Sequence, residues 1–305
     1  SIFSHSLGDH SVHDLPSKLI AAAQAGLEAV EISTIDLDHH ALQAQHASQP
    51  SPLLSAATEI GGICRDLNLT VTCLQPVRDV IEVTPKAIKS AQEKVFSLFP
   101  IMDALHTNLL LCCSSSLPEI ELNQSIESAI KNLHQIGLQA KLHSKLIAFE
   151  ALSWGTFINT WSQAWKIVKS VDLPNVGICL DSFNTLAREW ADPTVQGGIQ
   201  PGANSRLSES LIQLSHLPSE KIFLLQIADG LLLPKPIPKE SDQPALMRWS
   251  RSSRLFPMEP DGYLPVEAFI MAVALTGYQG IWSAEVFNTS LFSDHQLVPI
   301  SHALR

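Results

Sequence analysis

Residues 145–151 read KLIAFEA, an apolar run of strand length that ends beside a carboxylate, Glu150. Seven further runs of similar length occur along the chain: SIFSHSL (1–7), LEAVEIS (27–33), LTVTCLQ (69–75), TNLLLCC (107–113), NVGICLD (175–181), KIFLLQI (221–227) and GIWSAEV (280–286). Amphipathic segments with helical spacing separate the runs. Eight strand-then-helix units in 305 residues predict a closed (β/α)₈ TIM barrel that forms one domain over residues 1–305.

Two segments interrupt this alternation. Residues 187–205 and 228–262 are rich in proline, glycine and polar residues, and they follow the sixth and seventh runs. We expect long loops there, because loops at the carboxyl ends of barrel strands carry substrate contacts. An open, doubly wound sheet is the alternative fold, but no glycine-rich phosphate loop follows the first run to favour it.

The composition argues against several classes of partner. With a net charge of −10 and a pI near 5.6, the chain has no general basic field for nucleic acid or an anionic membrane surface. No run is long enough for a membrane span, and the first residues lack a signal-peptide pattern. The five cysteines show no zinc spacing and fit buried positions in a reducing compartment. We expect a soluble, cytoplasmic protein, and the sequence leaves its oligomeric state open.

Oxygen-bearing side chains lie at or near the ends of the last four runs. They are Glu150, Asp181, Gln226 and Glu285. In a parallel barrel these ends meet at one rim, so three carboxylates and one amide predict a divalent metal site. Such ligands suit Mg²⁺ or Mn²⁺ better than they suit zinc. The alternative is that each acid caps a helix or pairs with a basic residue. Glu31, near the end of the second run, is a further acid–base candidate, or a paired acid.

Several motifs resemble the fungal-type 3-dehydroshikimate dehydratases of the xylose isomerase-like barrel superfamily. The most specific are EALSWG (150–155), CLDSFN (179–184) and WSRSSRLFP (249–257), within a similarity that covers nearly the whole chain. The resemblance implies that water is eliminated from 3-dehydroshikimate to give protocatechuate in quinate and shikimate catabolism. It assigns the same four residues to Mg²⁺, Mn²⁺ or Co²⁺. In that reaction the bound cation stabilises the enolate formed from a small carboxylated cyclic ketone.

The resemblance also implies substrate-binding residues. Arg254 and Ser250 match family positions that bind the substrate carboxylate, and Asn184 lies in the matching CLDSFN block. Arg254 is accordingly also a catalytic candidate, together with Glu150 and Glu31. Arg78, just after the third run, is a second cation for the carboxylate, since the planar guanidinium can bind it bidentately.

The general base is not identified by the sequence. The family pattern has a histidine at positions that are Phe157 and Asn184 in this chain. His10 and His13, in the segment after the first run, are candidates for its replacement. A keto-sugar isomerase or epimerase, and a non-catalytic protein that kept the scaffold, are alternative functions. The arginines placed for a carboxylate argue against the first, and the intact ligand set argues against the second.

Overall fold

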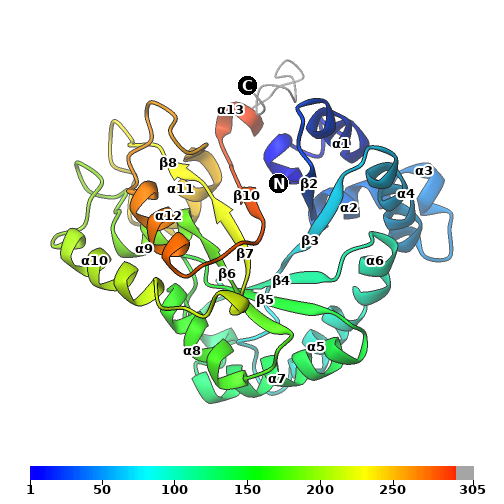
Figure 1. Ribbon diagram of the computed structural model, residues 1–305, viewed down its shortest axis with the longest axis horizontal. Coiled ribbons are helices and arrows are strands. Elements are labelled where there is room, and N and C mark those ends of the chain that lie inside the picture. Colours follow the sequence, from blue (N-terminus) through cyan, green and yellow to red (C-terminus); the bar gives the residue numbers. More distant parts are fainter. Residues whose placement is uncertain (293–305) are drawn as a thin grey trace.

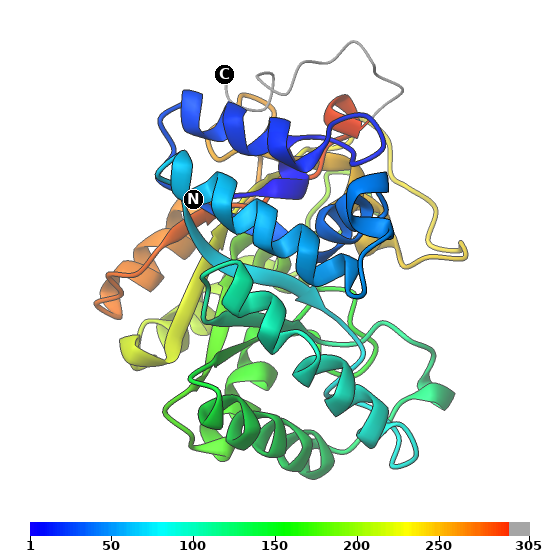
Figure 2. The same ribbon diagram turned by 90° about the vertical axis from the view of Figure 1, so that its right-hand side faces the viewer.

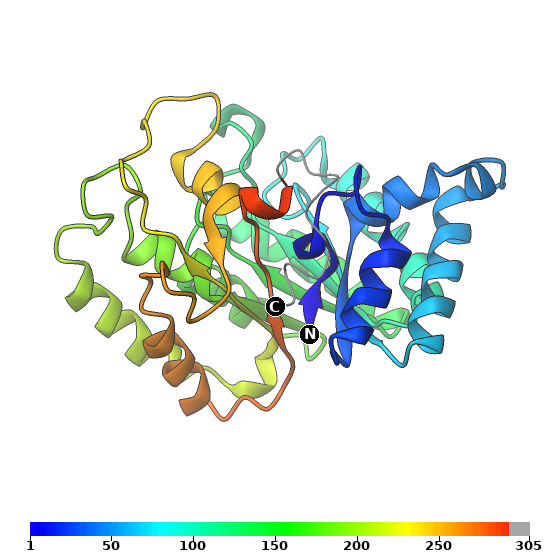
Figure 3. The ribbon, with the colours of Figure 1, turned by 90° about the horizontal axis from the view of Figure 1, so that it is seen from above.

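The computed structural model describes residues 1–292, and its strands form a closed barrel. The barrel strands are β1 (Ile2–Phe3), β2 (Ala29–Ser33), β3 (Thr70–Val77), β4 (Leu109–Cys113), β5 (Leu146–Glu150), β6 (Val176–Asp181), β7 (Ile222–Ile227) and β10 (Trp282–Ala284). All neighbouring pairs are parallel, and β1 closes the barrel against β10, as Figure 3 shows. The predicted (β/α)₈ barrel is therefore confirmed.

The helices surround the strands (Figure 1). They are α1 (Leu15–Gln24), α2 (Thr34–Ala41), α3 (Ala44–Ala47), α4 (Pro52–Asp66), α5 (Ile88–Phe96), α6 (Phe99–Ala104), α7 (Ile126–Leu142), α8 (Trp161–Val171), α9 (Ser182–Glu189), α10 (Ala203–Leu214), α11 (Ala245–Ser253), α12 (Val266–Leu275) and α13 (Thr289–Phe292). Figure 2 shows α1, α4 and α7 one below another on the outside of the barrel. Among the described residues, no helix has the length and hydrophobicity to cross a bilayer.

Burial explains why the strand runs are almost continuously apolar. Every residue of β4 is buried, because one face packs against side chains inside the barrel and the other against the helices. All five cysteines are buried and none forms a disulfide, as the sequence predicts. The register of β4 with β5 places Cys113 opposite Glu150, so the polar end of β5 lies at the end of the barrel wall.

The outer runs are shorter as strands than the sequence predicts. Only Ile2–Phe3 of the first run is a strand, and Ser4–Leu7 turns into a 3₁₀ helix. β10 ends at Ala284, which leaves Glu285 immediately beyond the strand. The backbone of Glu285 still donates to the Ile227 carbonyl at 3.3 Å, so its side chain stays close to the carboxyl end of β7.

The two segments predicted as long loops contain some regular structure. Residues 187–205 contain the end of α9 and the start of α10, while 228–262 contain α11, β8 (Asp229–Gly230) and β9 (Arg254–Leu255). Helix α11 packs Trp249 into the interior, where its ring centre lies 4.7 Å from that of Phe183. The two short strands β8 and β9 pair antiparallel and hold the end of α11 next to β7.

Candidate metal centre and active site

The structure brings the four predicted metal ligands to one rim of the barrel. Glu150 ends β5, Asp181 ends β6, Gln226 lies near the end of β7 and Glu285 follows β10. One carboxylate oxygen from each of the three acids lies within 4.8 Å of the others. All three acids are buried, so their negative charges are concentrated where water cannot screen them.

Asp181 both caps a helix and belongs to the cluster. Its Oδ1 accepts hydrogen bonds from the backbone N–H groups of Phe183 (2.6 Å) and Asn184 (3.2 Å), at the start of α9. Its Oδ2 faces the cluster and accepts from the side chain of Asn184 at 2.9 Å. Asp181 therefore caps α9 with Oδ1 and belongs to the predicted site with Oδ2.

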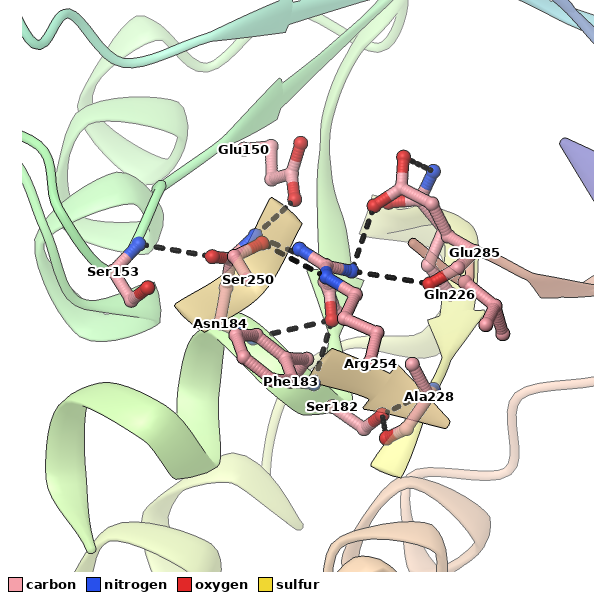
Figure 4. A network of polar contacts seen from close by, with 12 residues as sticks. Glu150, Ser153, Ser182, Phe183, Asn184, Gln226, Ala228, Ser250, Arg254 and Glu285 are labelled. Atoms are coloured by element: carbon pink, nitrogen blue, oxygen red, sulfur yellow. Dashed lines mark hydrogen bonds and ion pairs between the residues drawn. The ribbon is translucent and has the colours of Figure 1, made fainter. Parts of the chain in front are cut away.

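Asn184 connects two of the acids. Its Nδ2 donates to Glu150 Oε1 at 2.7 Å as well as to Asp181, and its Oδ1 accepts from the backbone N–H of Ser153 at 3.0 Å (Figure 4). These bonds fix the direction of the amide. Asn184 thus holds the carboxylates in place, while Phe157, the other position where the family has histidine, packs against the hydrophobic core.

Gln226 reaches the cluster with its amide nitrogen. Its Nε2 donates to Glu285 Oε1 at 3.1 Å and to Glu31 Oε2 at 3.0 Å, and its Oε1 accepts from the Cys179 thiol at 3.4 Å. An amide nitrogen cannot ligate a cation, so binding through Gln226 requires the amide to turn by 180° and present Oε1.

Glu31 and Gln75 form a second layer beside the cluster. Gln75 Nε2 bridges Glu31 Oε2 at 3.1 Å and Glu285 Oε1 at 2.9 Å. Glu31 is fully buried, and this burial together with the charge of Glu285 raises its pKa to about 8. Gln75 was not among the predicted residues, although the run LTVTCLQ ends on it, and the same strand-end signal identifies it.

Arg254 lies in the middle of the acids (Figure 4). It is 1% exposed, and its Nη1 donates to Asp181 Oδ2 at 2.8 Å and to Glu285 Oε2 at 2.9 Å. Its Nε donates to Ser250 Oγ at 3.0 Å. Pairing of β9 with β8 sets this position, since Arg254 lies opposite Gly230. The residue predicted to hold a substrate carboxylate thus already has two carboxylate partners within the chain.

The charges of the cluster are only partly balanced. Burial and the neighbouring charges of Glu285 and Asp181 raise the pKa of Glu150 well above its ordinary value. Burial also raises the pKa of Glu285, although Arg254 opposes the shift. Three acids lie around one guanidinium, and the atoms that they offer as metal ligands are all carboxylate oxygens. This set fits a hard divalent ion, which would offset the remaining negative charge.

A pocket with a cavity volume of about 380 Å³ opens onto the cluster. Its walls include Glu150, Glu285, Arg254 and Ser250 of the predicted site, and also Arg78 and Arg251. Within residues 1–292, neither Arg78 nor Arg251 pairs with an acidic side chain. Partial burial of the Arg251 guanidinium, with the nearby charge of Arg78, lowers the pKa of Arg251. Two cations that repel each other thus share this wall.

His5, rather than His10 or His13, lines the pocket. It lies in the 3₁₀ helix after β1, and its Nδ1 is 3.3 Å from Asp36 Oδ1. Asp36 also accepts from Ser4 Oγ at 2.7 Å and from Lys18 Nζ at 2.9 Å. Burial opposes the charge of Asp36, but the hydrogen bond from His5 and the charge of Lys18 lower its pKa to about 2. No sequence signal distinguishes His5 from the other histidines near the N-terminus.

The barrel fold agrees with comparisons to known proteins. A model of the xylose isomerase-like TIM barrel family matches residues 19–304. The chain belongs to this family. A 3-dehydroshikimate dehydratase of Neurospora crassa is 33% identical over 100% of this chain and 90% of the relative. A 3-dehydroshikimate dehydratase of Pseudomonas aeruginosa is 32% identical over 90% of this chain, but only 36% of that longer relative is covered.

A solved structure shares the barrel fold. A xylose isomerase-like TIM barrel/4-hydroxyphenylpyruvate dioxygenase fusion protein superposes with a TM-score of 0.77 at 28% identity, over 99% of this chain and 40% of the fusion protein. The resemblance to 3-dehydroshikimate dehydratases inferred from the motifs is confirmed, and within the xylose isomerase-like family this chain is similar to relatives of that name.

Proposed function

We propose that this chain is a divalent-metal-dependent 3-dehydroshikimate dehydratase that forms protocatechuate in quinate and shikimate catabolism. The observation that carries the proposal is the pocket, which joins the buried carboxylate cluster to Arg78 and Arg251. The reaction needs both parts, since the substrate combines a ketone with a carboxylate. The names of the relatives support the same activity.

The chemistry assigns a task to each part of the pocket. The reaction breaks a C–H bond beside the ketone and a C–O bond at the neighbouring carbon, so one water molecule leaves and a cyclic dienone forms. The dienone becomes aromatic when its CH₂ group loses a proton and the ketone oxygen gains one, with no further net change. A Mg²⁺ or Mn²⁺ ion held by Glu150, Asp181, Gln226 and Glu285 would act as a Lewis acid toward the ketone oxygen, and Co²⁺ suits the same donors.

The cationic wall orients the substrate. Arg78 and Arg251 are the pocket cations that the described part of the chain leaves without an acidic partner, whereas Arg254 is held by Asp181 and Glu285. Each guanidinium can bind a carboxylate through two parallel hydrogen bonds. We therefore propose that Arg78 and Arg251 bind the substrate carboxylate, while Arg254, whose Nε donates to Ser250, pairs with the acids of the cluster. A keto-sugar has no carboxylate for this wall.

His5 is our proposal for the group that moves the proton. A general base must reach the acidic carbon and be held in direction, and His5 lines the pocket while Asp36 holds its Nδ1. Asp36 stays ionised at neutral pH because its pKa is about 2, so it stabilises the positive charge that the imidazole gains. This pair offers a base in a chain that has Phe157 and Asn184 at the family's histidine positions.

The test is an ultraviolet assay for the aromatic product. Chelator-treated protein is given 3-dehydroshikimate, with and without Mg²⁺ or Mn²⁺, and a ketohexose serves as the second substrate. The proposal expects metal-dependent formation of protocatechuate and no change in the sugar. Metal-loaded protein that leaves 3-dehydroshikimate unchanged would refute the dehydratase, and isomerisation of the sugar would favour the alternative.

A further inference from the structure

A second group of possible metal ligands lies outside the barrel, away from the residues of the pocket. It consists of His40 on α2, His46 on α3 and Glu59 on α4, three consecutive helices that follow β2 (Figure 1). One ligand atom from each residue lies within 4.8 Å of the other two. The Glu59 carboxylate is the centre of the group, since its Oε2 is 2.6 Å from His46 Nε2 and 3.4 Å from His40 Nε2.

The two imidazoles are turned so that their Nε2 atoms converge. His46 Nδ1 is 2.9 Å from the Ser55 hydroxyl, which fixes the ring and directs Nε2 toward Glu59. Metal-binding histidines are usually oriented in this way, by a hydrogen bond to the nitrogen that does not bind the ion. The ring centres of His40 and His46 are 5.0 Å apart, so both rings can reach a single ion.

His40 supplies an independent reason to expect a ligand. The residue is 2% exposed, yet within the described residues its Nδ1 has no hydrogen-bond partner, and its Nε2 has only the Glu59 carboxylate at the long distance of 3.4 Å. Buried polar atoms normally have a partner, because leaving water without one costs free energy. Burial also lowers the pKa of His40, although Glu59 opposes this shift. The neutral imidazole favoured by burial is the form that binds metal.

The donor set selects the kind of metal. Two imidazole nitrogens and one carboxylate oxygen form one of the three-ligand sets that bind zinc in open sites, where water takes the fourth position. This differs from the barrel rim, where carboxylate and amide oxygens suit Mg²⁺ or Mn²⁺. We propose that His40, His46 and Glu59 bind a zinc ion that ties α2, α3 and α4 together on the outside of the barrel. The inference does not depend on the proposed dehydratase activity.

A bound ion would have a structural effect. Helix α3 has only four residues, so its own hydrogen bonds hold it weakly, and the ion would fasten it to the fifteen-residue α4. Because the three ligands come together only in the folded chain, zinc would raise the free energy of unfolding. The substrate pocket shares none of the three ligands, so turnover should not depend on them.

Cobalt spectroscopy on the full chain tests the proposal. Chelator-treated protein is titrated with Co²⁺, which absorbs strongly in the visible range when tetrahedral and weakly when six-coordinate. The wild type and Glu285→Ala, which removes a ligand at the rim, should both give the intense band. Glu59→Gln and His46→Gln should lose it. Zinc content measured by mass spectrometry should fall by one equivalent in the same two variants, with the aromatic-product assay unchanged.

Glu93→Gln is the matched control, since Glu93 is an exposed glutamate on α5 and outside the cluster. It should keep both the band and the zinc. Circular dichroism of Glu59→Gln checks that the variant is folded, which is expected because Glu59 is 38% exposed. An unchanged cobalt band and zinc content in folded Glu59→Gln would overturn the proposal and leave Glu59 as an ion-pair partner of His46.

Discussion

Removing Arg254 should destabilise the metal-free protein strongly. Its Nη1 donates at 2.8 Å and 2.9 Å to two buried carboxylates, Asp181 and Glu285, and no other cation contacts either of them among the described residues. Breaking a buried ion pair from one side leaves uncompensated charge and costs about 3–5 kcal/mol. We expect a loss of that size in the free energy of unfolding of Arg254→Met, which keeps most of the side-chain volume.

The loss converts into a measurable shift. With about 2.1 cal/mol/K of unfolding entropy per residue, a 305-residue chain has roughly 0.64 kcal/mol/K, so the melting temperature should fall by about 5–8 °C. Urea titration followed by circular dichroism, in chelator at pH 7, measures the free energy directly. Adding Mn²⁺ should restore part of the loss, because a cation among the acids replaces the missing charge.

Two variants sharpen the experiment. Arg254→Lys keeps the charge but loses the forked geometry that reaches both acids, so its loss should be intermediate. Arg65→Met on α4 is the control, since Arg65 is exposed and its guanidinium only approaches His106 Nε2 at 3.5 Å. It should stay within about 0.5 kcal/mol of the wild type. A loss below about 1 kcal/mol in Arg254→Met would refute the reasoning that Arg254 balances the buried acids.

Other predictions concern the pocket and one buried acid outside it. Arg78→Met and Arg251→Met should each lower kcat/KM for 3-dehydroshikimate by about 10- to 150-fold, the value of a charge-assisted hydrogen bond of about 1.5–3 kcal/mol; steady-state kinetics showing no change would remove them from carboxylate binding. Glu285→Ala should abolish both Mn²⁺ binding in calorimetry and turnover, whereas tight binding in this variant would contradict the rim site. His5→Gln should lower kcat by about 10²- to 10⁴-fold with little change in KM, and an unchanged kcat would exclude His5 as the base. Glu82 is buried, accepts the backbone N–H groups of two loops and has a pKa raised by burial to about 7. In the folded state Glu82 keeps its proton up to about pH 7, whereas in the unfolded state it loses the proton above pH 4.5. Between pH 4.5 and 7.5 the free energy of unfolding of the wild type should therefore fall by up to about 3 kcal/mol more than that of Glu82→Gln. Urea titrations that show the same pH dependence of this free energy in both proteins would contradict the prediction.

The sequence by itself determined the barrel and the oxygen-bearing rim. Strand period and helix period are local properties, and eight repeats of them leave few ways to bury every strand on both faces. The ends of neighbouring parallel strands must then lie side by side, so Glu150 and Asp181 could be paired without coordinates. Gln75 follows from the same rule. The strand boundaries predicted from the first and last runs are less accurate. β1 and β10 are short, and the rest of each run forms a 3₁₀ helix or a loop.

Only the tertiary structure decided what the loops bring to this rim. Arg254 and Arg251 both lie in the WSRSSRLFP segment, yet Arg254 is buried and pairs with two acids, whereas Arg251 is exposed and pairs with no acid among the described residues. The β8–β9 pairing and the docking of Trp249 make that difference, and both depend on contacts across more than 15 residues of chain. His5 is separated by 31 residues from the Asp36 that orients it. The orientation of these side chains is set by packing between distant parts of the chain, whereas sequence periodicity indicates only which face of a helix or strand is buried.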